Sequence, residues 1–408
     1  MSQFFRIALS GCLACVAAYP DLLLRDVSIV DVSTGTILAK QSILIRGDKI
    51  AAVGTAIVPP KDVRIVEAAG KYVVPGFWDM HVHLTSKEQL RMFLANGVTG
   101  VRDMGSNFDV VKQWRDAVQK GALTGPHIET SGPAFDGFPA DDPKVPVSMV
   151  RDPREARTAF DRLDDQGIDF VSVFPRLPRD AYFALAERAR KYYSFVSGPL
   201  PATVSLAEAI DARQKTVDRM SGVLLACSTD EQKLRPIRSL ALERGDWEGF
   251  RAAEAAAMNS LSLEKAHSLF RRMAVFETRS VPMLVAISSS PRTELYGTLM
   301  RLLMFMHQDG VGVMAGTDAG QSNLHPGEAL HRELELLVEA GFSPAEALRT
   351  TTLEPAKYLD AMETLGTVGQ GRIADLVLLN ANPLSDIRNT RKIANVILGG
   401  QLLPHTAQ

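Results

Sequence analysis

The stretch PGFWDMHVHL, from Pro75 to Leu84, contains two histidines, His81 and His83, separated by one residue. On a β-strand, residues i and i+2 point to the same face, so the two imidazoles would lie side by side. Imidazoles are common ligands of divalent metal ions, but two of them do not complete a site. The stretch therefore raises the question of which other residues could join this pair.

The region around this stretch alternates short apolar runs with longer helical segments, such as Ala181–Lys191 and Ala329–Ala340. Such alternation over nearly 300 residues is typical of parallel βα units. It predicts an α/β fold with a (β/α)8 TIM barrel. The eight candidate strands are the run leading into His81 and residues 100–103, 127–131, 169–174, 195–198, 216–219, 281–287 and 311–318.

The two ends of the chain have a different pattern, with short runs rich in Val and Ile. These runs lie between Asp21 and Gly54, at Ala374–Leu379 and at Ala394–Leu403. Their alternation of apolar and polar residues is typical of antiparallel strands, and predicts a small β-sandwich built from both ends. The expected domains are residues 19–74 and 365–408 for the sandwich and residues 75–364 for the barrel.

The charge of the chain excludes some classes of partner. The formal net charge is -2 over 408 residues, so no electrostatic attraction to nucleic acid or to an anionic membrane is expected. We also expect no transmembrane segment, because the longest N-terminal apolar run, Ile7–Ala18, is too short to span a bilayer.

That N-terminal run follows Arg6 and fits the core of a signal peptide, with cleavage after Ala18. Residues 1–18 therefore predict an exported, periplasmic protein. Leu9 to Cys12 also resemble a lipobox, which would make the protein a lipoprotein anchored through Cys12. The other interpretation is an internal or non-native N-terminus on a cytoplasmic protein.

A candidate partner for the histidines comes late in the chain. Asp318 stands in the run Gly316-Thr317-Asp318-Ala319-Gly320, at the end of the eighth candidate strand. The C-terminal ends of barrel strands lie at one face and carry the chemistry, so Asp318 is expected near His81 and His83. Two neutral imidazoles and a carboxylate suit zinc, manganese or iron. Hydrolysis at such a site needs a water whose pKa the metal lowers, and a base such as Asp318.

Several of these motifs resemble the amidohydrolase superfamily. PGFWDMHVHL is similar to its first barrel strand, where Pro-Gly precedes Asp-x-His-x-His, and AGTDAG (residues 315–320) is similar to its eighth. GVTGVRDMGS (Gly97–Ser106) resembles its second strand, and Leu365–Leu384 the strand pair that re-enters the end sandwich. The similarity runs from about Asp21 to Leu403 and is closest to the branch of imidazolonepropionase-like and Xaa-Pro dipeptidase-like hydrolases.

This resemblance implies hydrolysis of a C–N bond, amide or peptide-like, through a metal-activated water. It implies metal ligands His81, His83 and Asp318, with Asp318 also as the catalytic base. A small-molecule or peptide-like substrate follows from it, whereas the oligomeric state, including a homo-oligomer, stays open.

The chain departs from the family at three further ligand positions. Ser172 stands where the fourth strand usually offers a lysine, and Pro199 and Arg219 stand where the fifth and sixth strands usually offer histidines. These departures predict a reduced, mononuclear metal site, most simply with one zinc ion. They equally fit an alternative in which the protein has lost catalysis and serves as a binding or scaffold protein. Arg219, Arg176 and His325 are weaker candidates for substrate contacts. Arg219 could instead pair with Asp318 and replace the metal, whereas Asp218 before it is expected to point to the opposite face of the strand.

Overall fold

The computed structural model describes residues 21–140, 145–288, 294–321 and 323–404. The expected signal peptide at residues 1–18, with Cys12, lies outside the described residues. Within them, no helix combines the length and the apolar character needed to cross a membrane.

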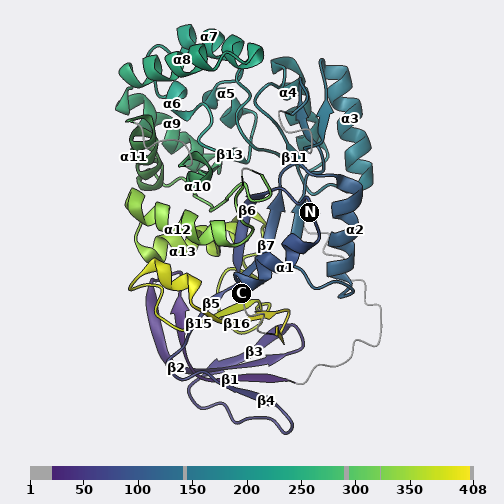
Figure 1. Cartoon of the computed structure of the whole chain (residues 1–408), viewed down its shortest axis with the longest axis vertical. Coiled ribbons are helices and arrows are strands. Elements are labelled where there is room, and N and C mark those ends of the chain that lie inside the picture. The colour runs from purple at the N-terminus through teal and green to yellow at the C-terminus, as the bar shows by residue number, and fades with distance from the viewer. Residues whose placement is uncertain (1–20, 141–144, 289–293, 322, 405–408) are drawn as a thin grey trace.

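Both ends of the chain contribute to one eight-stranded sheet, at the lower end of Figure 1. The central pairing joins β5 and β15 antiparallel, with Pro75 opposite Leu376. Leu24, Ile43 and Ile397 are among the buried residues of this sheet's own hydrophobic cluster. The order of the strands is β17 (Gln401–Leu402), β16 (Ile393–Leu398), β15 (Leu376–Leu379), β5 (Tyr72–Pro75), β1 (Leu22–Asp31), β2 (Thr36–Arg46) and β3 (Lys49–Gly54), with β4 (Arg64–Glu67) also paired to β1.

The middle of the chain forms short parallel strands that curl around a common core. They belong to separate small sheets: β6 (Phe77–Val82), β7 (Val98–Asp103) and β8 (His127–Thr130); β9 (Ala134–Asp136) and β10 (Val147–Met149); β11 (Val171–Ser172) and β12 (Val196–Ser197); β13 (Thr216–Asp218) and β14 (Arg279–Val281). Isolated parallel bridges at Val313 and Ala319 link the late chain to β14 and β6. The fold is thus mixed α/β with a curled sheet, and no single sheet closes into a barrel among the described residues.

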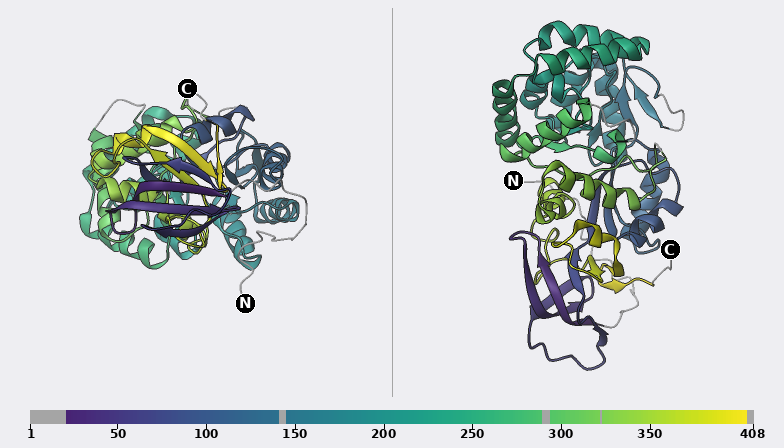
Figure 2. Two further views of the ribbon diagram at one scale, coloured as in Figure 1. Left: turned by 90° about the horizontal axis from the view of Figure 1, so that it is seen from below. Right: turned by 60° about the vertical axis from the view of Figure 1, so that its left-hand side comes forward.

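Helices surround these strands, with α7 and α8 at the end opposite the eight-stranded sheet (Figures 1 and 2). Their starts and stops follow local chemistry. Helix α3, for example, begins after Asp152, whose side chain accepts hydrogen bonds from two backbone N–H groups, and ends at Gly167 in the left-handed conformation. The helices are α1 (Glu88–Ala95), α2 (Phe108–Gln119), α3 (Pro153–Gln166), α4 (Arg179–Lys191), α5 (Leu206–Asp211), α6 (Val223–Ala226), α7 (Glu231–Arg244), α8 (Trp247–Asn259), α9 (Leu263–Val275), α10 (Leu284–Ile287), α11 (Glu294–Gln308), α12 (Glu328–Ala340), α13 (Pro344–Thr350), α14 (Leu353–Tyr358) and the 3-10 helix η1 (Ile387–Arg391).

Two of the predicted barrel strands differ from the structure. The seventh was expected at residues 281–287, but β14 ends at Val281 and α10 follows it. Met283 turns the chain in the left-handed region at φ 54°, and buried Glu333 accepts the N–H groups of Leu284 (2.9 Å) and Val285 (2.7 Å). Residues 311–318, expected as the eighth strand, form only one isolated bridge, at Val313. The domain bounds proposed from the sequence stay a prediction.

Candidate metal centre

Hydrogen bonds between two distant segments bring the site together. His81 lies near the end of β6, and His83 follows the last residue of that strand. The Asp318 N–H donates to the His81 carbonyl (2.8 Å), and the His83 N–H donates to the Ala319 carbonyl (2.8 Å). Gly316 permits this approach, because a Cβ there would lie 2.8 Å from the Cβ of His81. Backbone hydrogen bonds thus hold the two segments together.

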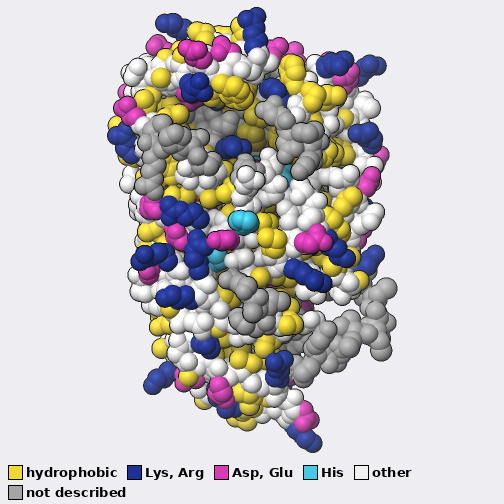
Figure 3. All heavy atoms as spheres, in the orientation of Figure 1, with side chains coloured by type: hydrophobic (Ala, Val, Ile, Leu, Met, Phe, Trp, Pro, Cys, Tyr) yellow, Lys and Arg dark blue, Asp and Glu magenta, His cyan; other side chains and the backbone are white. Residues whose placement is uncertain are grey.

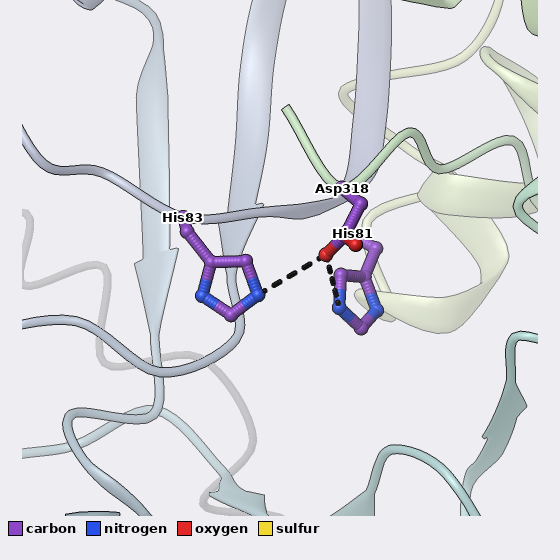
Figure 4. Close-up of side chains that lie close together, drawn as sticks. All are labelled: His81, His83 and Asp318. Atoms are coloured by element: carbon purple, nitrogen blue, oxygen red, sulfur yellow. Dashed lines mark ion pairs between the residues drawn. The ribbon is translucent and has the colours of Figure 1, made fainter. Parts of the chain in front are cut away.

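The three side chains converge on one point, as Figure 4 shows. Asp318 Oδ1 lies 3.3 Å from His83 Nε2 and 3.7 Å from His81 Nε2. All three residues are buried, and among the described residues they form the one group of three or more His, Cys, Asp or Glu side chains close enough to share an ion. Tetrahedral zinc with bonds of about 2.0–2.1 Å holds its ligand atoms about 3.3 Å apart. The spacing therefore fits one small divalent ion.

The other ring nitrogens determine how these histidines are oriented. His81 Nδ1 lies 2.7 Å from Asp218 Oδ2, and His83 Nδ1 lies 3.4 Å from the Gly105 carbonyl oxygen. Both partners are acceptors, so each Nδ1 carries the proton and donates it. In a neutral imidazole each Nε2 would then point its lone pair at the Asp318 carboxylate. A positive charge, either a proton or a metal ion, must therefore lie between these groups.

The buried charges shift the pKa values of the three groups in different directions. Burial raises the pKa of Asp318, but the hydrogen bond with His83 and the charges of His81, His83 and Arg219 outweigh it and hold that pKa well below its usual range. Burial lowers the pKa of His83, yet the adjacent Asp318 leaves it raised overall. For His81, burial outweighs the Asp218 and Asp318 carboxylates, and the pKa is lowered. His81 is thus kept neutral, as a metal ligand must be.

Arg219 reaches the same carboxylate from the other side. Its Nη1 donates to Asp318 Oδ2 at 3.1 Å, the oxygen that does not face the histidines. The arginine side chain is 48% exposed, whereas that of Asp318 is 2% exposed. Arg219 follows the end of β13 with φ 62°, so the chain leaves the strand geometry at this residue. The guanidinium therefore covers the solvent side of a buried acid.

The remaining predicted site residues lie elsewhere or are bound otherwise. Ser172 is buried and donates its hydroxyl to the Met104 carbonyl (2.8 Å), and Pro199 is buried just beyond β12. Arg176 donates to the Pro139 carbonyl at 2.5 Å. His325 is exposed and is not part of the three-residue group.

Two residues near the site were not predicted to serve it. Asp218 was expected to point away from Arg219 because neighbours alternate on a strand, yet both side chains reach the cluster. The reason is that β13 ends at Asp218, so the alternation stops there. Arg102, on β7, is fully buried and donates to Asp218 Oδ2 at 2.9 Å. The sequence VRD in a buried strand was the available signal, since an arginine there must find an acid.

Asp79 supports the site from within the same strand. It is buried and accepts hydrogen bonds from the Thr317 N–H (3.1 Å) and hydroxyl (2.6 Å). Burial raises the pKa of Asp79 to about 7. This carboxyl thus ties the segment before Asp318 to β6, two residues from His81.

Part of the chain is similar in sequence to a known protein family. Residues 291–403 match the family described as "Amidohydrolase family". Adenine deaminase of Rubrobacter xylanophilus is 35% identical over 91 residues, which are 22% of this chain and 15% of that protein. Adenine deaminase of Staphylothermus marinus is 24% identical over 386 residues, covering 88% of this chain and 54% of the relative. The chain thus spans at most about half the length of these two curated relatives.

Solved structures extend the likeness along nearly the whole chain. A Xaa-Pro dipeptidase with bound methionine in the active site has a TM-score of 0.73 at 21% identity, covering 94% of this chain and 99% of that one. A putative prolidase from Bifidobacterium longum has a TM-score of 0.71 at 24% identity, covering 95% of each chain. Identities this low show the fold alone. Residues 291–403 thus match the amidohydrolase family by sequence, and nearly the whole chain is similar in fold to solved dipeptidase and amidohydrolase structures.

Proposed function

We propose that this protein hydrolyses a C–N bond, amide or peptide-like, with one divalent metal ion held by His81, His83 and Asp318, and that the ion is zinc. One observation carries the proposal: both histidines donate through Nδ1 and turn Nε2 toward the same carboxylate oxygen. Carboxylate or carbonyl partners on the far ring nitrogen are the usual support of metal-binding histidines. Members of this family usually bind a divalent metal.

The residues around the cluster assign roles to the chain itself. A divalent ion bound there would lower the pKa of a water molecule and polarise the scissile carbonyl. Asp318 Oδ2 is the oxygen left to accept a proton, but Arg219 occupies it and keeps its basicity low. A substrate carboxylate would compete for the guanidinium, since arginine binds carboxylates through a planar fork of donors. We therefore propose a peptide-like substrate with a free carboxylate that binds Arg219. This binding would release Asp318 from its ion pair with Arg219, so that Asp318 could act as the base.

The wider setting supports this assignment. Figure 3 shows the face hollowed in the region where Figure 1 labels β11 and β13, with apolar and basic side chains in the hollow. We propose that the curled strands act as the (β/α)8 barrel of the family, with a mouth at that hollow, and that the protein is exported through residues 1–18. The neighbours named as dipeptidase and prolidase support a small peptide-like substrate.

The test is metal analysis of the purified protein together with hydrolysis of a panel of Xaa-Pro dipeptides and N-acyl amino acids. We expect about one equivalent of zinc in the wild type, and its loss with the activity in H83A. H307A is the matched control, because it removes a histidine paired with Glu346 away from the cluster. A wild-type protein that takes up no metal in metal-supplemented medium would contradict the proposal.

A second candidate function is a binding protein without catalysis. The ion pair of Arg219 with Asp318 favours it, because a guanidinium can supply the positive charge that a metal would otherwise bring. In that case the wild type holds no metal, whereas R219M gains metal binding because the competing cation is gone. If R219M and the wild type bind the same single equivalent, Arg219 does not substitute for the ion.

A further inference from the structure

Arg102 is among the largest fully buried side chains of the described residues. A buried guanidinium is costly unless its donors are matched with acceptors and its charge is paired. Arg102 meets both conditions. Nε donates to the Met80 carbonyl (2.6 Å), Nη1 donates to Thr216 Oγ1 (3.3 Å) and Tyr358 Oη (3.0 Å), and Nη2 donates to Asp218 Oδ2 (2.9 Å). With all three nitrogens engaged, the guanidinium has one orientation.

The orientation matters because of what Asp218 does next. Its Oδ2 accepts from Arg102 Nη2 on one side and from His81 Nδ1, at 2.7 Å, on the other. Asp218 is fully buried, so no water can take over either contact without rearrangement. Arg102 comes from β7, Asp218 from β13 and His81 from β6, so the contact joins three strands. The Arg102 guanidinium thus fixes the Asp218 carboxylate, which in turn orients the His81 ring.

His83 provides an internal comparison. Its Nδ1 donates to a backbone carbonyl at 3.4 Å, and that acceptor is neutral and fixed by the chain. The bond of His81 to Asp218 is shorter and involves an ionised group, which makes such hydrogen bonds roughly twice as strong. Only His81 therefore depends on a side chain that another side chain must hold in place.

We propose that Arg102 is a positioning residue, which fixes Asp218 so that His81 keeps its proton on Nδ1 and presents Nε2 to the metal. This inference rests on the proposed metal site at His81, His83 and Asp318. Among the described residues, the hydrogen bonds of Arg102 go to Met80, Thr216, Tyr358 and Asp218, and not to the side chains of His81, His83 or Asp318. Its Nε–H also binds the Met80 carbonyl, next to His81 in the chain, but its link to the His81 imidazole runs through Asp218. Removing Asp218 should therefore abolish the effect of Arg102 on the imidazole.

The first experiment needs no metal. In protein prepared with a chelator, ¹⁵N NMR of the imidazole rings reports which nitrogen carries the proton. We expect the Nδ1–H form for both histidines in the wild type. In R102M, His81 should lose that preference while His83 retains it. Y358F is the matched control, because it removes one hydrogen bond to Arg102 and leaves the Asp218 contact. Unchanged His81 signals in folded R102M, or equal changes in both histidines, would overturn the proposal.

The second experiment measures zinc affinity in a double-mutant cycle. R102M and D218N should each weaken binding by about 10–100-fold, the range typical for partners of metal ligands. R102M/D218N should bind no more weakly than D218N, because the two residues act in series. Additive losses would mean that Arg102 acts independently of Asp218 and would overturn the proposal. The double variant also leaves no unpaired buried acid, so it keeps the test available if R102M does not fold.

The two experiments separate this inference from the proposed function. A wild type that binds no zinc contradicts the proposed metal site. The ring signals of metal-free R102M then still decide whether Arg102 controls His81.

Discussion

A substitution at Gly320 should move the segment that carries Asp318 away from the segment that carries His83. Gly320 lies two residues after Asp318 with φ 95°, and a Cβ there would stand 1.9 Å from the His83 carbonyl oxygen. That is 1.1 Å inside the 3.0 Å limit that real Cβ atoms keep. In G320A the segment of Asp318 must therefore move away from that of His83 by about 1 Å. Metal sites hold their ligand distances within about 0.2 Å.

G320A should have a small effect on stability and a large effect on zinc affinity. A left-handed backbone at alanine costs about 1–2 kcal/mol, and loss of the His83 N–H bond to Ala319 costs about 1 kcal/mol more. For a chain of 408 residues, about 1 kcal/mol moves Tm by only about 1 °C. We expect G320A to melt about 2–4 °C below the wild type, but to bind zinc at least about 100-fold more weakly, because a ligand itself is displaced.

The assay is competitive zinc titration with a chelator of known affinity, alongside thermal melting. G371A is the matched control, because Gly371 also has positive φ (85°), but a Cβ at that residue would meet nothing within 4 Å. It should share the backbone cost and leave zinc binding unchanged. If G320A binds zinc as tightly as G371A, the site does not depend on the close approach of these two segments.

Two other predictions concern groups away from the site. The hydrogen bond with Arg179, and to a smaller extent those with Ser205, lower the pKa of Glu208 to about 2. The stability that ionised Glu208 supplies is therefore complete above about pH 4.5 and is lost as the pH falls to about 2. Because this pair is substantially exposed, E208Q should lose at most about 1 kcal/mol at pH 7. In urea unfolding the difference should vanish near pH 2–3, and a difference that grows toward low pH would contradict the assignment. Burial raises the pKa of Cys227 to about 12, so the folded wild type and C227A should label equally with a thiol reagent at pH 8 and differ by one thiol only in denaturant. Faster labelling of the folded wild type would show that this thiol is accessible.

The convergence of His81, His83 and Asp318 follows from the sequence because it depends on strong local patterns. The two histidines share a strand face or its extension, and the Gly-rich run around Asp318 allows a close approach. The ion pair of Arg219 with Asp318 was one of the alternatives left open by the sequence. The placement of Asp218 did not follow, because alternation holds only while the strand continues. Arg219 takes positive φ directly after β13, and no residue type in that run signals such a turn.

The predicted seventh strand also shows what a local sequence pattern cannot decide. The run from Val281 to Ile287 is apolar and β-branched in part, which fits a strand or a buried helix equally well. Glu333, far along the chain on α12, decides between them by accepting the N–H groups of Leu284 and Val285. A contact between residues about 50 positions apart is not visible in the local pattern.

The sheet formed from both chain ends has a consequence for synthesis on the ribosome. β5 ends at Pro75, but its antiparallel partner β15 begins only at Leu376, about 300 residues later. At about 5–20 residues per second, the β5 edge waits about 15–60 s for that partner. During this time an apolar strand edge is open to pairing with other chains. Ribosome density, chaperone supply and growth temperature should therefore affect the yield of this protein before its final strands are made.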